Sequence, residues 1–455
     1  MGLAAKSRPM RHAPTSRPLR AASAAWFLAA ALRALGDDAS SGIAEQLRLL
    51  QQQNAALQQQ LHQQQQVIEE LGRKVDKLQA ADLGQREADT HAAAEPTAES
   101  LIPARSAFNR IHLRGEGAVA FSDSQANGQF PNHEFRVDEA RLYLEAPIWG
   151  EVYFFGELNL YQREEHEIDL RAGEVFIDAE NLSKLWGEDR QLNLRAGRFN
   201  MPFGEEYLLR HAIDNPLISH SVTDLWGVNE GLEVYGALGP FRYVAAVQNG
   251  PYNVVRDFNG DKTFTGRLAY EPFKWLHLSG SALRTGQLDI KQDKLSALWI
   301  GSGFVRPIGS AAATVFQADL LEGDLQLRFA HTTLKAAGGL IRYEDNDQPV
   351  HNRRRVTYYY AEAVQDIYGG LYAAARWSQV FAPGGYPIAG IGNVGEYAFG
   401  PDLTSGLHLL SLGIGYRWSP QLVLKVEYSI EGGSEAGGTP RRLENMLSAT
   451  AAFAF

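Results

Sequence analysis

Acidic and basic side chains recur at every second position in several otherwise apolar segments of the chain. In the segment 139–145, Glu139, Arg141 and Glu145 alternate with alanine and leucine. Because successive side chains of a β-strand point to opposite faces, this spacing collects the charges on one face. Such a face can line a water-filled lumen and orient polar solutes in it. The residues that we predict to line a pore are Arg141, Arg195, Arg267, Arg328, Arg376 and Arg417, together with Glu139, Glu145 and Glu157.

A second group of titratable side chains lies in the segment 200–229, which contains no lysine. Pro202 cannot donate to a strand ladder and Gly204 permits an unusual φ, so a strand is expected to end there and a long loop to begin. A plain hairpin loop is the alternative to a loop that constricts the pore. The predicted constriction residues are Glu205, Glu206, Arg210, His211, Asp214, His220 and Asp224.

Sequence motifs for catalysis and metal binding are missing. The chain has no Gly-x-Ser-x-Gly, His-Glu-x-x-His or Walker-type motif. The segment 257–261 has oxygen ligands at calcium-like spacing but lacks the glutamate that completes an EF-hand loop, so it predicts a turn. Without cysteine, disulfides and thiolate sites are excluded. We therefore predict no enzyme activity, cofactor or metal, with an outer-membrane barrel enzyme as the alternative.

The composition fits a membrane β-barrel and excludes a helical membrane protein. The mean hydropathy is −0.27, and no run approaches the roughly 18 consecutive apolar residues of a spanning helix. Barrel strands show lipid only every second residue, so their hydropathy stays unremarkable. A net charge of −10 gives no support to a nucleic-acid partner.

Short and long connections alternate along residues 107–455, which predicts an antiparallel transmembrane β-barrel. With 324–344 taken as one extended strand, the pattern gives about 16 strands, an even number with both ends in the periplasm. The short connections are expected around Pro147, 239–240, Pro272, 322–323, 369–370 and 419–420, with a longer one at 179–190. The long connections are expected at 122–134, 161–168, 200–229, 250–262, 286–311, 345–353, 381–405 and 432–441.

Three segments precede the predicted barrel. Residues 1–36 combine basic residues with a short apolar stretch and predict a signal peptide. Apolar residues in 37–80 recur at spacings of three and four and predict a short α-helical coiled coil, with a lone solvated helix as the alternative. Residues 81–106 predict a flexible linker. The core positions of the coiled coil are Leu47, Leu50, Asn54, Leu57, Leu61, Gln64, Ile68, Leu71, Val75 and Leu78.

A basic run at 353–355 precedes three tyrosines at 358–360. Cations beside stacking rings occur on nucleic-acid surfaces. The same residues suit the outer rim of a barrel, where tyrosines form an interfacial girdle and arginines meet lipid phosphates. We predict the rim position.

Two segments resemble the phosphate-selective porin O and P family: EARLYLE at 139–145 and LRAGRFNMPFGEE at 194–206. The layout is similar over about 43–455. The resemblance implies a trimeric barrel of 16 strands whose third outer loop folds into the pore, often preceded by a coiled coil. Asn200 stands where the family commonly has lysine, and the following loop is acidic. These residues indicate a broader or different solute than phosphate.

The sequence therefore predicts an outer-membrane porin that forms a water-filled channel for passive diffusion of small polar or ionic solutes, with anions such as phosphate as candidates. Its expected partners are two further copies in a homotrimer, outer-membrane lipid and, through the periplasmic coiled coil, the cell wall. The alternative is a structural tether, in which the coiled coil holds the outer membrane to the layer beneath and the barrel is its anchor.

Overall fold

The computed structural model describes residues 111–126, 128–161, 170–250, 260–291, 298–309, 312–347, 352–442 and 444–455. All of them belong to one of two compact units of the chain, Pro96–Phe455. The signal peptide (1–36), the coiled coil (37–80) with its core positions, and the linker (81–106) lie outside the described residues and stay predictions. Most of the turn predicted at 257–261 also lies outside them.

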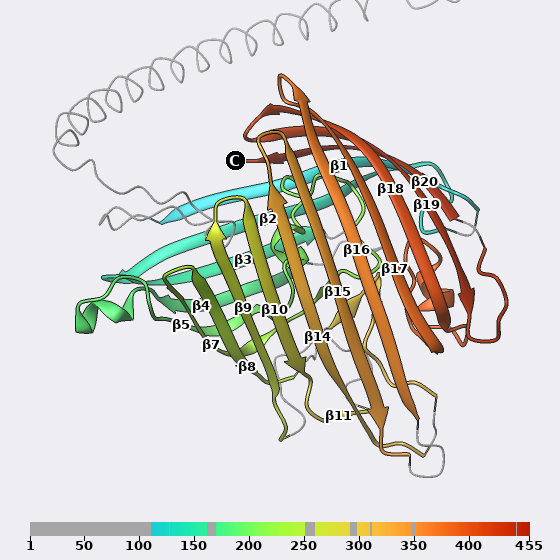
Figure 1. Cartoon of the computed structure of the whole chain (residues 1–455), viewed down its shortest axis with the longest axis horizontal. Coiled ribbons are helices and arrows are strands. Elements are labelled where there is room, and N and C mark those ends of the chain that lie inside the picture. The colour runs from blue at the N-terminus through green and yellow to red at the C-terminus, as the bar shows by residue number, and fades with distance from the viewer. Residues whose placement is uncertain are drawn as a thin grey trace, which may run out of the picture. The chain divides into compact units, whose positions relative to one another are not determined.

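Long antiparallel strands make up most of the described chain (Figure 1). They are β1 (His112–Ser124), β2 (Glu134–Trp149), β3 (Val152–Tyr161), β4 (Arg171–Ala179), β5 (Asn193–Asn200), β7 (Val228–Leu238), β8 (Phe241–Gln248), β9 (Thr263–Phe273), β10 (Leu276–Arg284), β14 (Val315–Arg328), β15 (Thr332–Asp345), β16 (Arg353–Tyr368), β17 (Leu371–Tyr386), β18 (Thr404–Ser419), β19 (Leu422–Glu435) and β20 (Glu444–Ala454). The short elements are η1 (Leu182–Trp186), η2 (Glu206–Leu209), β6 (Leu225–Trp226), β11 (Leu288–Asp289), β12 (Trp299–Ile300), β13 (Gly303–Phe304) and α3 (Val394–Tyr397).

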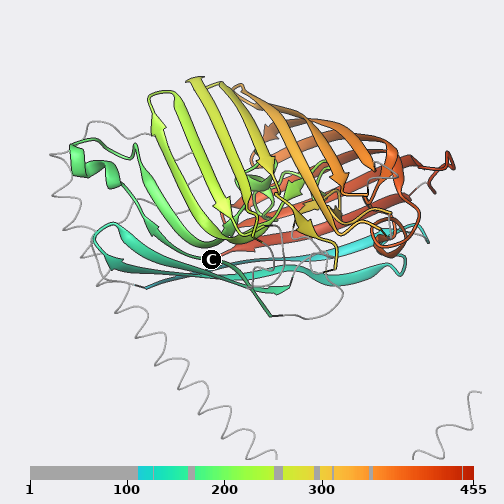
Figure 2. The same ribbon diagram turned by 90° about the horizontal axis from the view of Figure 1, so that it is seen from below.

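The sheet closes on itself because β1 pairs with β20 (Figures 1 and 2). Gly117 lies opposite Phe453 in that register, and the Gly115 N–H donates to the Phe455 carbonyl at 2.9 Å. The sheet has 17 strands, but β10 and β11 both pair with β14 as successive parts of one line. The barrel therefore has 16 strands around its circumference. Closure leaves no unpaired edge, and it confirms the predicted fold class and strand number.

Short and long connections lie at opposite rims of the barrel. We call the rim of the short turns, such as 239–240, 369–370 and 420–421, the inner rim, and it also holds the start of β1 and the end of β20. The longer connection to β5 at this rim contains η1. The other end is the outer rim, where 201–224 and 387–403 connect strands. In bacterial barrels the short turns face the periplasm.

One predicted turn is wrong. Glu322 and Gly323 lie inside β14, where Gly323 pairs with Gly280 and with Gly338 on the neighbouring strands. The chain turns instead at 329–331, so 324–344 contributes to two strands rather than one. The strand number is unaffected because the turn is displaced and not added. A glycine indicates a turn through positive φ, and Gly323 has an extended backbone.

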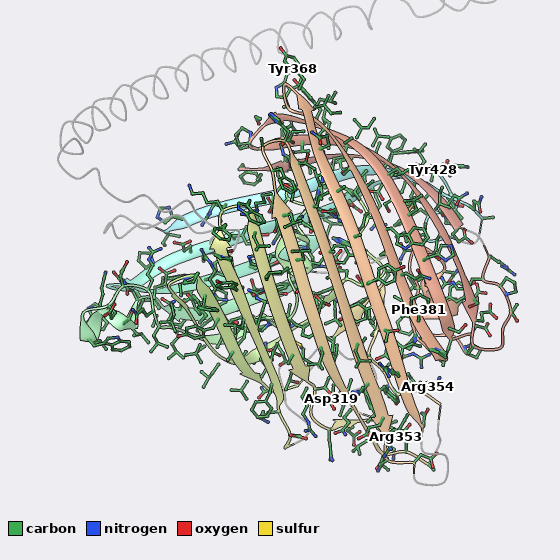
Figure 3. The ribbon with its side chains drawn as sticks, in the orientation of Figure 1. Asp319, Arg353, Arg354, Tyr368, Phe381 and Tyr428 are labelled. Carbon is green, nitrogen blue, oxygen red and sulfur yellow. The ribbon has the colours of Figure 1, made fainter. Side chains whose placement is uncertain are left out.

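The two faces of the barrel wall differ in polarity. Inward positions hold buried polar groups such as Asp178, Ser281 and Glu427. Outward positions hold exposed apolar or aromatic groups, among them Phe381 and Tyr428, which are 43% and 44% exposed (Figure 3). This is the polarity that lipid outside and water inside require. Among the described residues, no helix is long and apolar enough to cross a membrane.

The predicted girdle of three tyrosines is only partly correct. Tyr359 is exposed and outward, as expected for a girdle, but Tyr358 and Tyr360 are buried and point inward. The Tyr358 hydroxyl donates to Glu322 Oε2 at 2.7 Å. Consecutive positions of one strand alternate in direction, so three adjacent tyrosines cannot share the outer face.

Segments from the outer rim fold back into the barrel and pack together. β6, β12 and β13 form a small separate sheet in which β12 pairs with both partners. Leu225, Ile300 and Ile388 are buried in the cluster that these segments share with the wall. Apolar side chains of these segments therefore occupy part of the barrel interior near the outer rim.

Candidate functional site

The loop between β5 and β7 folds into the barrel and crosses its lumen. It leaves the wall after Asn200, and Gly204 takes a positive φ of 70° that turns the chain inward. The Gly204 N–H donates to Ser281 Oγ at 3.0 Å, and Arg267 Nη1 donates to the Gly204 carbonyl at 2.7 Å. We call residues 201–224 the lumen loop. β9 and β10 hold its beginning.

The middle of the lumen loop is fixed against β17 and β19. Arg376 Nη1 donates to the Ser219 carbonyl at 2.8 Å, and its Nη2 donates to the Asn215 side chain at 3.0 Å. The Glu427 carboxylate accepts from the Ser219 N–H at 2.9 Å, and Lys425 Nζ donates to the Asn215 carbonyl at 2.5 Å. All five residues are buried. Buried charges are stable when they are paired and hydrogen-bonded, so loop and wall satisfy each other's polar groups.

A third anchor joins the lumen loop to β1 and β2. The Ala212 N–H donates to Glu139 Oε2 at 2.8 Å, and His211 Nδ1 contacts the Glu116 carboxylate. Burial disfavours the charged imidazole, but the neighbouring Glu116 charge outweighs it and raises the pKa of His211 above its ordinary value. Together the three anchors place the loop across the lumen from one side of the wall to the other.

Glu205 lies where the loop meets β9 and β10. Its carboxylate is 3.0 Å from His277 Nε2 and 3.6 Å from Arg267 Nε. Burial acts to raise the pKa of Glu205, but the Arg267 charge and the hydrogen bond from His277 hold it below its ordinary value. Glu205 therefore contacts two basic side chains of the wall.

Glu206, Arg210 and His220 each contact another residue of the loop. Arg210 pairs with Asp224 and lies over the Trp226 ring at 4.2 Å from its centroid. His220 Nδ1 is 3.8 Å from the same carboxylate. Glu206 accepts a backbone N–H from the returning part of the loop at 3.0 Å. These contacts make the loop a compact body.

Arg195 is held on the inner face of β5 by carboxylates from both neighbouring strands. Its Nη2 lies 3.0 Å from Asp178 and its Nη1 lies 3.0 Å from Glu233. The guanidinium also lies over the Phe176 ring, 4.3 Å from the centroid. Its charge is neutralised locally, so it contributes little net field in the lumen.

Arg141 and the three predicted glutamates also lie on the inner wall. Arg141 contacts Glu139 directly and lies 3.8 Å from Glu157. Glu145 pairs with Arg114 at 3.1 Å. The structure thus brings Arg141, Glu139 and Glu157 together and leaves Glu145 in a separate pair.

A cavity of about 210 Å³ lies between the lumen loop and the inner-rim half of the wall. Asp214 of the loop borders it, and burial raises the pKa of this carboxyl. Arg328 and Arg417 are exposed on its wall side, and Arg417 packs over the Tyr372 ring at 4.4 Å from the centroid. Its polar lining includes Glu205, Asp214, Arg242, Glu271, His277, Asp324, Gln326, Arg328, Thr333, Lys335, Tyr360 and Arg417.

The predicted arginines thus fall into two groups. Arg141, Arg195, Arg267 and Arg376 are engaged by carboxylates or by the lumen loop. Arg328 and Arg417 border the cavity and are exposed. The first group is held by contacts with the wall or the lumen loop, and the second lies at the surface of the cavity.

Sequence reasoning missed several residues of the constriction. Lys425 could have been found, because it lies two positions before Glu427 and shares its face. Asn215 and Ser219 gave no signal, because neutral polar residues are typical of any surface loop. The aromatic contact between β6 and β12, where Trp226 stacks on Trp299 at 5.5 Å and 10°, was also not predicted.

The comparisons with known proteins identify no family. No family model and no curated protein matches the chain. Solved structures with a similar fold include OmpT, an outer membrane protein of Vibrio cholerae, in its trimer form, at 9% identity and a TM-score of 0.48 over 76% of this chain and 99% of that one. An anion-selective porin from Comamonas acidovorans has 11% identity and a TM-score of 0.48, with coverage of 76% and 99%. The outer membrane channel DcaP of Acinetobacter baumannii has 11% identity and a TM-score of 0.47, with coverage of 76% and 97%. The resemblance to the phosphate-selective porins stays a prediction, and the function rests on the geometry of the lumen.

Proposed function

We propose that the chain is a porin that forms a passive channel across a bacterial outer membrane for small polar or ionic solutes. One observation carries the proposal: a closed barrel with apolar groups outside and polar groups inside is crossed by an inward-folded loop. Backbone in lipid must be fully paired, which a closed barrel achieves. A barrel of this size encloses a lumen, and the loop narrows it to a size filter.

The ionic groups of the constriction act on solutes through fixed dipoles. Most inward arginines are paired with carboxylates, so the lumen presents adjacent charges of both signs instead of one net charge. Such an arrangement gives a transverse field that orients polar solutes without a large barrier for either sign of ion. Broad selectivity follows from this arrangement.

We further propose that anions, phosphate among them, bind transiently at Arg328 and Arg417. Both side chains are exposed in the inner-rim cavity, and Arg417 Nη1 is 4.0 Å from its nearest carboxylate oxygen, on Asp366. A guanidinium that is loosely paired can bind phosphate oxygens through two parallel hydrogen bonds.

A homotrimer is the proposed assembly, on the resemblance described above. Chemical cross-linking of the full chain in detergent tests this assembly. We expect the largest cross-linked species to contain three copies. A limit at one copy under conditions that keep the barrel folded would contradict it.

Swelling of vesicles tests the channel. Vesicles that contain the folded full chain are placed in solutions of a monosaccharide, a disaccharide and a large dextran. We expect fast swelling in the monosaccharide, slower swelling in the disaccharide and none in the dextran. If folded protein is present in the vesicles and the smallest sugar causes no swelling, the proposal is wrong.

The reversal potential in a KCl gradient tests the anion contact separately. We expect Arg328→Gln with Arg417→Gln to shift the reversal potential toward cations and to weaken any block of chloride current by phosphate. Lys184→Gln, which removes an exposed cation of η1, is the matched control and should leave both unchanged. Equal reversal potentials in the double variant and the wild type would remove the anion proposal and leave the channel proposal standing.

A further inference from the structure

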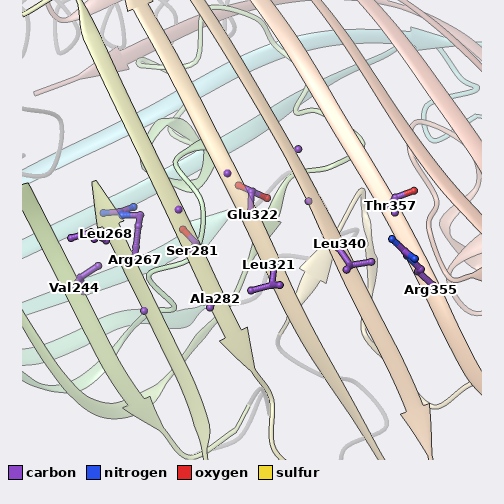
Figure 4. Close-up of a pocket in the computed structure, with 15 residues that line it drawn as sticks. Val244, Arg267, Leu268, Ser281, Ala282, Leu321, Glu322, Leu340, Arg355 and Thr357 are labelled. Carbon is purple, nitrogen blue, oxygen red and sulfur yellow. The ribbon is translucent and has the colours of Figure 1, made fainter. Parts of the chain in front are cut away.

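A groove of about 810 Å³ runs over the outward face of β9, β10, β14 and β15 (Figure 4). Leu268, Leu321 and Leu340 stand along it, and glycines form its floor. Register places Gly280 opposite Gly323, and Gly323 opposite Gly338, on three successive strands. Gly266 extends the floor on β9. The outer wall therefore has a strip without side chains inside its apolar face.

The fold itself does not require these glycines. A Cβ atom at Gly266, Gly280, Gly323 or Gly338 would meet nothing closer than 3.6 Å, and none of the four has a positive φ. Glycine inside a strand is less stable than alanine, because it loses more backbone freedom on folding. Where internal packing gives no reason for it, glycine in a strand marks a close approach from outside. The groove is thus shaped for a molecule that lies against the wall.

Arginines cross the same strands nearer to the outer rim. Register places Asp319 opposite Arg342, and Arg342 opposite Arg355, while Arg284 on β10 lies 3.9 Å from Asp319. Arg342 and Arg355 are exposed and outward. Within the described part of the chain, neither has a carboxylate at ion-pair distance, although like charges directly opposite each other destabilise a sheet. An external anion would offset that repulsion.

The arginine row and the glycine floor are parts of one surface. On β15, Arg342 lies four positions nearer to the outer rim than Gly338. Arg284 and Arg355 have the same offset on their own strands from the residue that is level with the glycine floor, which is a glycine on β10 and a tyrosine on β16. Four strand residues span about 13 Å. Arg355 itself lines the groove. A lipid places its phosphate at the membrane surface and its acyl chain below, in the same order along the bilayer normal.

We propose that this surface binds a phosphate-bearing lipid of the outer leaflet. Its phosphate lies between Arg342 and Arg355, and one acyl chain lies over Gly280, Gly323 and Gly338. Arg284 lies one strand further along, beyond Asp319, and offsets the charge of that carboxylate. The arginine row selects the phosphate of the head group. The absence of side chains at the glycine floor lets the acyl chain lie close to the protein backbone. This proposal does not depend on conduction.

Binding of a fluorescent lipid A that carries two phosphates tests the proposal. The full chain in neutral detergent micelles is titrated with this lipid and with the same lipid after removal of its phosphates. We expect the wild type to bind the phosphorylated form more tightly. Arg342→Gln with Arg355→Gln should weaken it on the order of tenfold, because two charged hydrogen bonds are lost. Equal binding of the two lipids, or equal affinity of the double variant, would overturn the proposal.

A second variant tests the groove. We expect Gly323→Leu with Gly338→Leu to weaken binding of the phosphorylated lipid severalfold while folding and conductance are kept, because both side chains point into lipid. Ala140→Leu, a matched outward substitution on β2, should change nothing. Displacement of the lipid by inorganic phosphate at equal concentration would show that the site takes free phosphate and would overturn the lipid assignment. Loss of a cross-linked trimer in the glycine variant would assign the groove to a second copy and overturn it as well.

Discussion

Arg376 is the residue on which most of the constriction depends. It donates to two groups of the lumen loop, Asn215 and Ser219, and to Glu362 on the neighbouring strand at 2.8 Å. Its charge is buried, so its removal leaves the Glu362 carboxylate with Lys335 as its cation. Loop position and wall electrostatics are thus coupled through one guanidinium.

We expect Arg376→Gln to lower the free energy of unfolding by about 3 kcal/mol, since it breaks a buried and hydrogen-bonded pair. It should also increase current noise, because the loop loses an anchor. Urea unfolding of the barrel in vesicles measures the first effect and single-channel recording the second. Arg328→Gln is the control, because that side chain is exposed and its loss should leave stability nearly unchanged. Equal stability of the two variants would count against the anchor.

His211 gives the loop a dependence on pH. Because its pKa is raised by Glu116, the protonated ring stabilises the docked loop. That stabilisation is complete below the ordinary pKa of about 6.5 and is lost as the pH rises through the raised value. We expect current noise to rise in that range above pH 6.5 and to become independent of pH in His211→Gln. Other ionisable groups that face the ring in the described part of the chain include Glu139, Arg141, Tyr143 and Asp214.

Single-channel records from pH 5 to 9 check this expectation. His331→Gln, at an inner turn, is the control and should keep the wild-type pH profile. Noise that falls as the pH rises would mean that the neutral ring holds the loop, which contradicts the account.

At the residue scale the sequence predicted which face a side chain occupies but not its partner. The alternation of polar and apolar residues along the strands placed Arg267 and Arg376 on the inner face. It could not show that both are covered by a loop, because that contact joins positions more than 60 residues apart. Asn215 accepts two such contacts, from Arg376 and Lys425, and nothing in its type or spacing distinguishes it.

In the proposed channel, the lumen loop is the element that narrows the barrel. It is held at β9 and β10, at β1 and β2, and at β17 and β19. We expect replacement of 208–220 by a short Gly-Ser linker to raise single-channel conductance roughly twofold or more, because the open cross-section grows. Replacement of η1 at the inner rim, which makes no contact of this kind in the described part of the chain, is the control. Unchanged conductance after loop removal would place the narrowest point elsewhere.

Strands and turns were predicted unequally well. Alternation identified the strands because each has one apolar and one polar face. The turn at 329–331 was missed, since its residues Phe329, Ala330 and His331 are poor turn formers, whereas the Glu322-Gly323 pair resembles a turn. Gly323 belongs to the outer groove instead.

At the scale of the whole molecule, the proposed function depends on the closure of the barrel and on the polarity of its two faces. Sixteen strands with β1 paired to β20 leave no edge, and the outward face suits lipid. The strand number was predictable because an even count follows from termini on one rim. The packing of 298–309 and 387–403 inside the outer half could not be predicted, because loops give no periodic signal.

Single-channel current in a planar bilayer tests the central claim most directly. The full chain, folded in detergent and added to one side of a neutral bilayer in KCl, should give discrete current steps that are proportional to voltage, as a permanently open, water-filled lumen requires. Insertion of folded barrels, shown by resistance to protease, without any current steps would contradict the account.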